Sequence, residues 1–147
     1  MKVYIVSGCV GTGKTTFAKK LTKEKKAEYL NVKDLIKKYD ISSEYDKKRK
    51  CDVVDISKLI KVLNKIIKES KRRLVIDSHL SHYLNPKNVD KCYITKCDIK
   101  ELRKRLKKRN YSKSKIEENT EAEIMDVCYN EALEKGHKIE IVWSSKK

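Results

Sequence analysis

A loop rich in glycine constrains the fold of this chain more than any other feature. Three of the four glycines among its 147 residues lie in one stretch, Gly8-Cys9-Val10-Gly11-Thr12-Gly13-Lys14-Thr15. The stretch fits the pattern G-x-x-x-x-G-K-[ST], and it stands between an apolar run at 3–6 and a helix-like segment at 16–21. Strand, loop and helix in that order are the context that the pattern requires. A chance glycine turn beside a lysine is the alternative interpretation.

This context predicts a binding site for the phosphates of a nucleoside triphosphate. The N–H groups of such a loop converge with the N-terminus of the following helix on an anion. Lys14 would add a positive charge beside the outer phosphates, and the Thr15 hydroxyl is a ligand for Mg²⁺. We therefore expect a nucleotide and a magnesium ion at this loop.

The composition favours polyanionic partners. Lys and Arg number 37 against 21 Asp and Glu, which gives a net charge of +16. Such an excess favours nucleic acid through the release of counterions, whereas the alternative is that lysine only keeps the surface solvated. The length fits a single domain, 1–147, with no apolar run long enough for a membrane span and no signal peptide, so we expect a cytoplasmic protein without membrane contact. Five scattered cysteines without a C-x-x-C pair predict neither a disulfide framework nor a zinc site.

Strand-like and helix-like patterns alternate along the chain. Strands are predicted at 2–7, 27–32, 72–77, 91–96 and 138–143, and helices at 14–26, 33–39, 56–69, 98–109 and 113–135. This alternation predicts an α/β fold in which a five-stranded parallel sheet lies between two layers of helices. The stretch 40–55 has the least regular pattern, and we interpret it as a mobile loop beside the site.

The predicted strand at 72–77 ends in a carboxylate, and an imidazole follows two residues later. Ligands of an open α/β sheet bind at the carboxyl ends of its strands, so these side chains are expected near the phosphates. We predict that Asp77 holds Mg²⁺, directly or through water, rather than merely closing a strand at the surface. His79 is expected to orient or activate a water or an acceptor hydroxyl; a turn residue is the alternative. His82 lies three residues further on, but no third ligand for zinc is visible.

Three of the six arginines fall in one short segment, "LRKRLKKRNYSK". Because lysine supplies most of the positive charge elsewhere, arginine here suggests a use for its planar guanidinium, which binds phosphate through two donors. Arg105 and Arg109 are four residues apart and share one face of the predicted helix, whereas Arg103 lies on another side. An arginine in this position stabilises the charge of a phosphoryl group in transfer, and an exposed basic helix is the alternative.

Three stretches carry a resemblance to a known family. They are "GCVGTGKTT", "VIDSHLSHYL" and, the most specific, "LRKRLKKRNYSKSKIEENTEAEIMDVCYNEA". Through them, residues 2 to about 136 resemble the small atypical adenylate kinases of archaea and eukaryotes, which also act in maturation of the small ribosomal subunit. The resemblance implies a P-loop NTPase fold of the nucleoside monophosphate kinase type, with a monophosphate-binding segment at about 31–55 and a short lid at about 109–119.

The resemblance also implies site residues and partners. It implies that ATP is bound by Gly11, Gly13, Lys14, Thr15, Thr16 and Arg109. Asp77 and His79 match a motif in which the histidine is linked to ATP hydrolysis. Asn110 stands where the family usually has a glycine before the lid tyrosine. The implied partners are a small-subunit ribosomal protein and rRNA.

Together these observations predict an enzyme that uses Mg²⁺ and ATP. It would transfer the γ-phosphoryl group of ATP to AMP or a related nucleoside monophosphate, and hydrolyse ATP when the acceptor is absent. The predicted catalytic residues are Lys14, Asp77, His79 and Arg109, and the predicted magnesium ligands are Thr15 and Asp77. Two alternatives stay open: a ribosome-assembly ATPase with incidental kinase activity, and a basic RNA-binding module whose nucleotide is structural.

Overall fold

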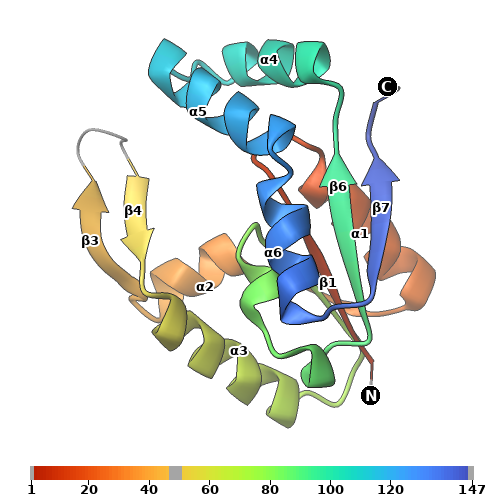
Figure 1. The fold of residues 1–147 in the computed structure, drawn as a ribbon. Coiled ribbons are helices and arrows are strands. Elements are labelled where there is room, and N and C mark those ends of the chain that lie inside the picture. The colour runs from red at the N-terminus through yellow and green to blue at the C-terminus, as the bar shows by residue number, and fades with distance from the viewer. Residues whose placement is uncertain (1, 47–50, 146–147) are drawn as a thin grey trace.

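Five parallel strands form the central sheet of the computed structural model, which describes residues 2–46 and 51–145 (Figure 1). The strands are β1 (Val3–Gly8), β2 (Glu28–Asn31), β5 (Leu74–Asp77), β6 (Lys91–Lys96) and β7 (Ile139–Trp143). Their order across the sheet is β2-β5-β1-β6-β7, which confirms the predicted parallel α/β fold. Since β5 and β1 are neighbours near the centre, the ends of both strands open onto the same edge.

Helices cover both faces of this sheet. Alternate residues of β1 point to opposite faces, so Val3 and Ile5 join one apolar cluster while Tyr4 and Val6 join another. The helix α1 (Lys14–Lys25) packs on the second cluster, and α3 (Ile56–Glu69) and α6 (Val127–Lys135) pack on the first. The three layers are therefore those that the sequence pattern predicts. None of the helices in the described part of the chain has the length and apolar content needed to cross a bilayer.

A separate apolar cluster places two further helices over the glycine-rich loop. The helices α4 (Ile99–Lys108) and α5 (Lys113–Ile124) pack against each other at the top of the view in Figure 1. Leu102 and Leu106 of α4 and Ile116 of α5 are buried together, with Val10 of the loop and Tyr111 packed against them. This cluster ties the α4–α5 pair to the loop that follows β1.

The remaining elements connect these layers. They are α2 (Val32–Lys38), the two strands β3 (Ser42–Asp46) and β4 (Cys51–Val54), and the short 3₁₀ helices η1 (Ser81–Tyr83) and η2 (Pro86–Asn88). We expected an irregular mobile loop at 40–55, and this was wrong, because β3 and β4 pair as an antiparallel hairpin. Residues 47–50 of that stretch lie outside the described residues.

The single helix expected at 113–135 was also wrong. It is two helices, α5 and α6, and the break falls at Met125 and Asp126. Asp126 has a φ of 51°, which is a left-handed backbone angle that no α-helix can continue through. The break lets α5 follow α4 while α6 turns to cover the sheet.

Candidate nucleotide-binding site

The loop between β1 and α1 depends on its glycines. Gly8 has a φ of 143°, and a Cβ there would lie 2.7 Å from the Thr95 carbonyl oxygen. Gly13 has a φ of 89°, and a Cβ there would lie 2.9 Å from the Ser144 Cβ. Side chains rarely adopt such angles and would collide with neighbouring atoms, so both positions need glycine for angle and for space. The predicted order of strand, loop and helix is confirmed.

Side chains from two other elements hold the loop in shape. The Thr12 hydroxyl donates to the Cys9 carbonyl at 2.6 Å and lies 2.7 Å from the Thr95 hydroxyl of β6. From α4, the Arg105 Nη1 donates to the Gly11 carbonyl at 3.0 Å. The Cys9 and Gly11 carbonyls are thus engaged by the protein, which fixes the orientation of these two peptide groups.

The N-terminus of α1 opens onto this loop. Gly13 is the N-cap residue and has no side chain to cap the helix. The first bond of the helical ladder runs from the Phe17 N–H to the Gly13 carbonyl, so the N–H groups before Phe17 have no partner inside the helix. Thr15 and Thr16, in the first turn, have exposed side chains. Unpaired N–H groups and the helix dipole favour an anion at this place.

Lys14 folds back over the loop. Its Nζ donates to the Cys9 carbonyl at 3.0 Å. Burial lowers the pKa of Lys14 from its ordinary value, while the negative charge of Asp77 acts in the opposite direction. A phosphate at the helix N-terminus would supply a stronger acceptor than this carbonyl and would favour the charged form of the amine.

A three-residue hydrogen-bond cluster joins α1 to the ends of β5 and β2. The Thr15 hydroxyl donates to Asp77 Oδ2 at 2.9 Å, and the Tyr29 hydroxyl donates to the same oxygen at 2.6 Å. Burial, together with the hydrogen bond to Asp77, raises the pKa of Tyr29 to about 12. Sequence analysis predicted Thr15 and Asp77 but missed Tyr29.

The pair of Thr15 and Asp77 fits a magnesium ion. Both side chains offer oxygen atoms, which are the donors that this hard cation prefers, and a hydroxyl with one carboxylate is the usual protein share of a site completed by phosphates and water. Asp77 is 5% exposed, so its carboxylate is fixed in place. The residues present therefore fit the ion that the sequence predicts.

The two histidines after β5 have different surroundings. The His79 side chain is exposed to solvent, yet desolvation by the surrounding protein and the charge of Lys14 lower its pKa to about 4. His82 is fully buried, with Nδ1 2.7 Å from the Ser7 hydroxyl and Nε2 3.1 Å from a Glu131 carboxylate oxygen. Because a carboxylate only accepts, the His82 Nε2 donates and the Ser7 hydroxyl donates to Nδ1. His82 is thus engaged in the protein interior, whereas His79 faces solvent at the strand end.

The three arginines of α4 divide between two sides, as their spacing predicts. The Arg105 guanidinium contacts the loop through the Gly11 carbonyl and also donates to the Ser144 hydroxyl at 3.0 Å. Arg109 is the C-cap residue of α4, one turn beyond Arg105, and its side chain is exposed. Arg103 turns away from the loop and pairs with Glu117 of α5. Arg105, which was not among the predicted site residues, is thus the arginine that touches the loop.

The backbone angle of Asn110 explains how this chain tolerates asparagine where the family usually has glycine. Asn110 has a φ of 59°, in the left-handed region that glycine adopts at no cost. Asparagine is among the few other residues that adopt this region with little strain. The turn before Tyr111 therefore keeps its shape with Asn110 in place of glycine.

Comparisons with known proteins show the family of this chain. Residues 5–126 match the model of a family described as AAA domain. A protein of Methanocaldococcus jannaschii named "Putative adenylate kinase" is 34% identical over 135 residues, which are 92% of this chain and 74% of that protein. The chain belongs to the small atypical adenylate kinase family. Another relative of this adenylate kinase family, from Saccharomyces cerevisiae and named "Adenylate kinase isoenzyme 6 homolog FAP7", is 35% identical over 131 residues, or 88% of this chain and 66% of that one.

Solved structures show the same fold outside the adenylate kinase family. Shikimate kinase from Acinetobacter baumannii superposes with a TM-score of 0.62, covering 95% of this chain and 82% of its own, at 14% sequence identity. At that identity the likeness concerns the fold alone. The chain is thus a P-loop kinase by family, and it shares its fold with shikimate kinase.

Proposed function

We propose that this chain transfers the γ-phosphoryl group of ATP to AMP or a related nucleoside monophosphate, in the presence of Mg²⁺. The observation that carries the proposal is the contact between the Thr15 hydroxyl and Asp77 Oδ2, beside a helix N-terminus that has no cap. The names of the relatives as adenylate kinases support the choice of acceptor. A cytoplasmic location is a prediction that accompanies the proposal.

The loop residues bind and orient the triphosphate. The N–H groups of five residues are proposed to bind the phosphates, namely those of Gly11, Gly13, Lys14, Thr15 and Thr16. The Lys14 amine leaves the Cys9 carbonyl and pairs with the outer phosphates. The bound magnesium, held by Thr15 and Asp77, would neutralise charge on the phosphate oxygens. Catalysis by such a site needs no covalent nucleophile, because orientation and charge neutralisation supply most of it.

Two segments outside the sheet are proposed to contact the nucleotides: the lid, which begins at Arg109, and the segment 31–55. Arg109 ends α4 with an exposed side chain and is proposed to reach ATP when the lid, 109–119, closes. The segment 31–55, which includes α2 and the β3–β4 hairpin, is proposed to hold the monophosphate. A guanidinium near the γ-phosphate stabilises the charge of the group in transfer.

His79 is proposed to influence the choice between transfer and hydrolysis. With a pKa of about 4, its imidazole is neutral at pH 7 and accepts a hydrogen bond from water. So weak a base orients a water better than it removes a proton from one. When AMP is absent, a water held in this way would take the place of the acceptor phosphate oxygen of AMP.

A second candidate is an ATPase of ribosome assembly whose hold on a small-subunit ribosomal protein and rRNA changes with the bound nucleotide. The net charge of +16 favours this candidate, since it suits a polyanionic partner. A basic RNA-binding module with a structural nucleotide is less favoured, because it gives no use to the buried carboxylate of Asp77.

One assay distinguishes the kinase, the ATPase and the RNA-binding module. Protein, ATP and Mg²⁺ are incubated with and without AMP, and ADP and free phosphate are both followed. The kinase forms ADP in proportion to AMP and releases free phosphate only when AMP is absent. The ATPase releases phosphate regardless of AMP, and a structural nucleotide gives neither product. A panel of monophosphate acceptors (AMP, GMP, CMP and UMP) then defines the substrate. Absence of any product from folded protein contradicts the proposal.

A further inference from the structure

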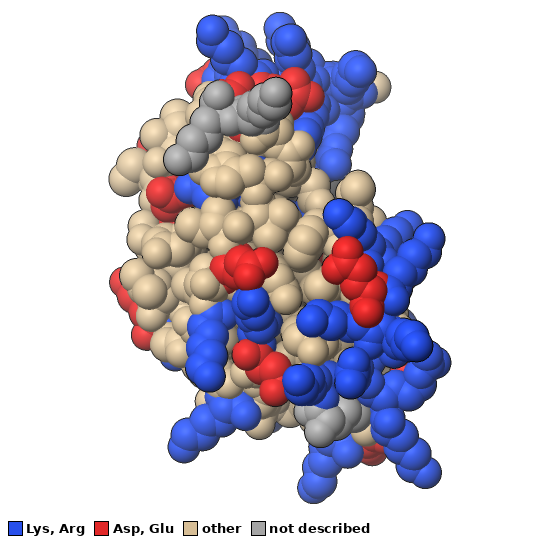
Figure 2. Space-filling view, turned by 90° about the vertical axis from the view of Figure 1, so that its right-hand side faces the viewer, with Lys and Arg blue, Asp and Glu red and all other residues tan. Residues whose placement is uncertain are grey.

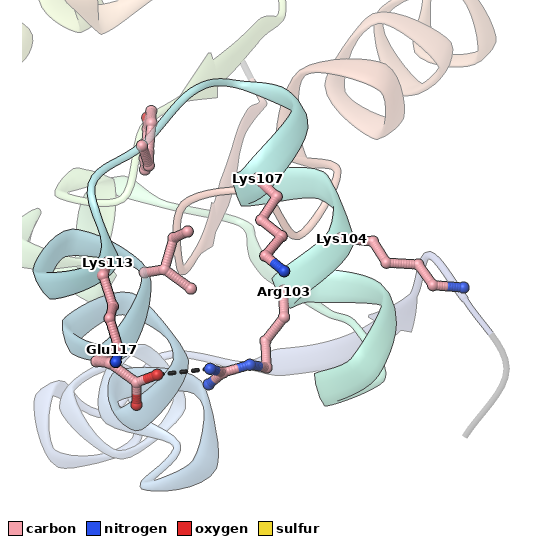
Figure 3. A pocket seen from close by; sticks show the side chains of 7 residues that line it. Arg103, Lys104, Lys107, Lys113 and Glu117 are labelled. Atoms are coloured by element: carbon pink, nitrogen blue, oxygen red, sulfur yellow. Dashed lines mark hydrogen bonds and ion pairs between the residues drawn. The ribbon is translucent and has the colours of Figure 1, made fainter.

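A hollow lies between α4 and α5 that the phosphate-binding loop does not use. Its volume is about 470 Å³, within the range of sites that hold small ligands. Figure 3 shows it from close by, with Arg103 and Lys107 reaching in from α4 and Lys113 and Glu117 facing them from α5. Lys104 stands at its outer edge.

The hollow and the loop lie on opposite flanks of α4. Leu102 and Leu106 form the buried face of this helix. The Arg105 side chain lies on one side of that face and contacts the loop. The Arg103 side chain lies on the other side and contacts Glu117 of α5. Lys107 lies four residues after Arg103 and therefore shares its side of the helix. A ligand in the hollow would not occupy the place of ATP.

Positive charge is concentrated around this hollow. Residues 99–115 contain nine basic residues and one acidic residue, so this short segment supplies half of the net charge of +16. Figure 2 shows Lys and Arg side chains at the top of the molecule, which is where Figure 1 places α4, as well as over its lower half. One carboxylate lines the hollow, that of Glu117, and Arg103 holds it at 2.5 Å. The ammonium groups of Lys104, Lys107 and Lys113 are therefore in excess.

An apolar wall distinguishes this place from a solvated basic surface. Tyr111 and Ile116 line the hollow, and both belong to the apolar cluster between α4, α5 and the loop. The Lys115 ammonium lies 4.4 Å from the centre of the Tyr111 ring and adds a further positive charge. Cations that follow a backbone, next to an aromatic ring that receives a base, are the features that bind single-stranded nucleic acid.

We propose that this hollow binds a single-stranded nucleic acid. The phosphates pair with Lys104, Lys107 and Lys113, and an unstacked base packs against Tyr111 and Ile116. A duplex keeps its bases stacked and cannot present one to the wall. An acidic peptide would satisfy the cations but offers no flat ring for Tyr111. Tyr111, Lys113 and Ile116 also lie in the segment 109–119 that is proposed to close over ATP, so the hollow and the phosphotransfer site share that segment.

The test measures the binding of a fluorescent oligouridylate of about 12 nucleotides, within the size range of single-strand sites. Anisotropy is recorded at several salt concentrations for the full chain and for the double variant Lys104→Glu/Lys107→Glu. The control variant is Lys20→Glu/Lys23→Glu, which makes the same charge change at two exposed residues with the same spacing on α1.

The α4 variant is expected to bind at least about 10-fold more weakly, and the slope of log affinity against log salt is expected to fall by about 1.4 for two lost phosphate contacts. The α1 variant is expected to lose less than about threefold, because a change in net charge alone acts weakly at screened distances. Equal losses in the two variants would overturn the proposal, since binding would then follow net charge only.

Two further binding experiments test the role of the Tyr111 ring and the chemical class of the ligand. Tyr111→Leu keeps an apolar side chain but removes the ring, so it should weaken oligouridylate while leaving inorganic polyphosphate unchanged. Polyglutamate of matched charge should bind more weakly than oligouridylate. Tighter binding of polyglutamate, or an equal effect of Tyr111→Leu on polyphosphate, contradicts the nucleic-acid assignment. Formation of ADP from ATP and AMP is measured in the same preparations; because binding is assayed without nucleotide, failure of either proposal is seen separately.

Discussion

The Thr15 hydroxyl donates a hydrogen bond to Asp77 Oδ2 at 2.9 Å, although 62 positions separate the two residues in the sequence. The bond joins the first turn of α1 to the end of β5, and it exists because β5 lies directly beside β1 in the sheet. A hydroxyl and a carboxylate at the same edge as an uncapped helix N-terminus form the centre of the proposed phosphotransfer site. The predictions below test the residues around this pair.

Replacing Lys14 tests the positive charge at the phosphates. Lys14→Ala is expected to lower the turnover of ATP by at least about 10², the scale for loss of one group that stabilises a transition state. The fold should persist, because the Lys14 amine contacts only a loop carbonyl among the bonds described for it. Steady-state kinetics measure the turnover, and circular dichroism measures the fold. Lys20→Ala, at an exposed position of the same helix, is the control, and normal activity of Lys14→Ala would count against the site.

Tyr29→Phe tests whether the Tyr29 hydroxyl orients the Asp77 carboxylate for Mg²⁺. The tyrosine hydroxyl holds Asp77 Oδ2 at 2.6 Å, and loss of a bond that orients a metal ligand lowers metal affinity by about 10- to 100-fold. We expect the Mg²⁺ concentration for half-maximal activity to rise by at least about 10-fold, with a smaller change in maximal rate. The matched control is Tyr83→Phe, since the Tyr83 hydroxyl donates to a Glu131 oxygen at 2.8 Å, in a different part of the protein. Identical Mg²⁺ curves for wild type and Tyr29→Phe would remove Tyr29 from the site.

His79→Ala tests the choice between acceptors. A neutral imidazole that orients water matters for hydrolysis, while AMP brings its own oriented phosphate oxygen. ATP hydrolysis should therefore fall more than transfer to AMP, when both are measured on one preparation. If the two rates fall by the same factor, His79 has a different role from the one assigned here.

The pH dependence of stability tests the two buried histidines. Desolvation lowers the pKa of His82 and of His137 below the ordinary value of 6.5. Below pH 6.5 the unfolded chain binds protons that the folded chain does not, so the stabilisation is complete above that pH and is lost as the pH falls. The urea midpoint should drop between pH 7.5 and pH 5.5.

A variant separates this effect from that of other groups. His137 Nε2 donates to the His82 carbonyl at 2.8 Å, and a glutamine amide has a donor for the same carbonyl but does not titrate in this range. His137→Gln should therefore show a smaller change of midpoint between the two pH values. An unchanged difference would mean that His137 is not one of the groups responsible.

The fold was largely predictable because strands and helices alternate with clear apolar patterns. The strand β6 and the helix α3 begin and end where the sequence places them. The break between α5 and α6 was missed, since it depends on the backbone angle of one residue, Asp126, and the helical period continues across it. The β3–β4 hairpin was missed because its residues show no alternation of apolar and polar side chains.

The site was predictable only where its residues stand next to a motif or a strand end. Lys14 and Thr15 belong to the glycine pattern, and Asp77 closes an apolar strand. Tyr29 approaches Asp77 because β2 lies beside β5, and strand order cannot be read from the spacing of the strands. Arg105 was recognised as sharing a face with Arg109, but its contact with the Gly11 carbonyl depends on how α4 sits over the loop.

The central claim is that the loop after β1 binds the phosphates of a nucleotide, and calorimetry tests it most directly. ATP with Mg²⁺, and separately ADP, are titrated into folded protein of the wild type and of Lys14→Ala. The account predicts heat that saturates at one nucleotide per chain for the wild type and a clearly weaker affinity for the variant. No heat from either nucleotide with folded wild-type protein would contradict it.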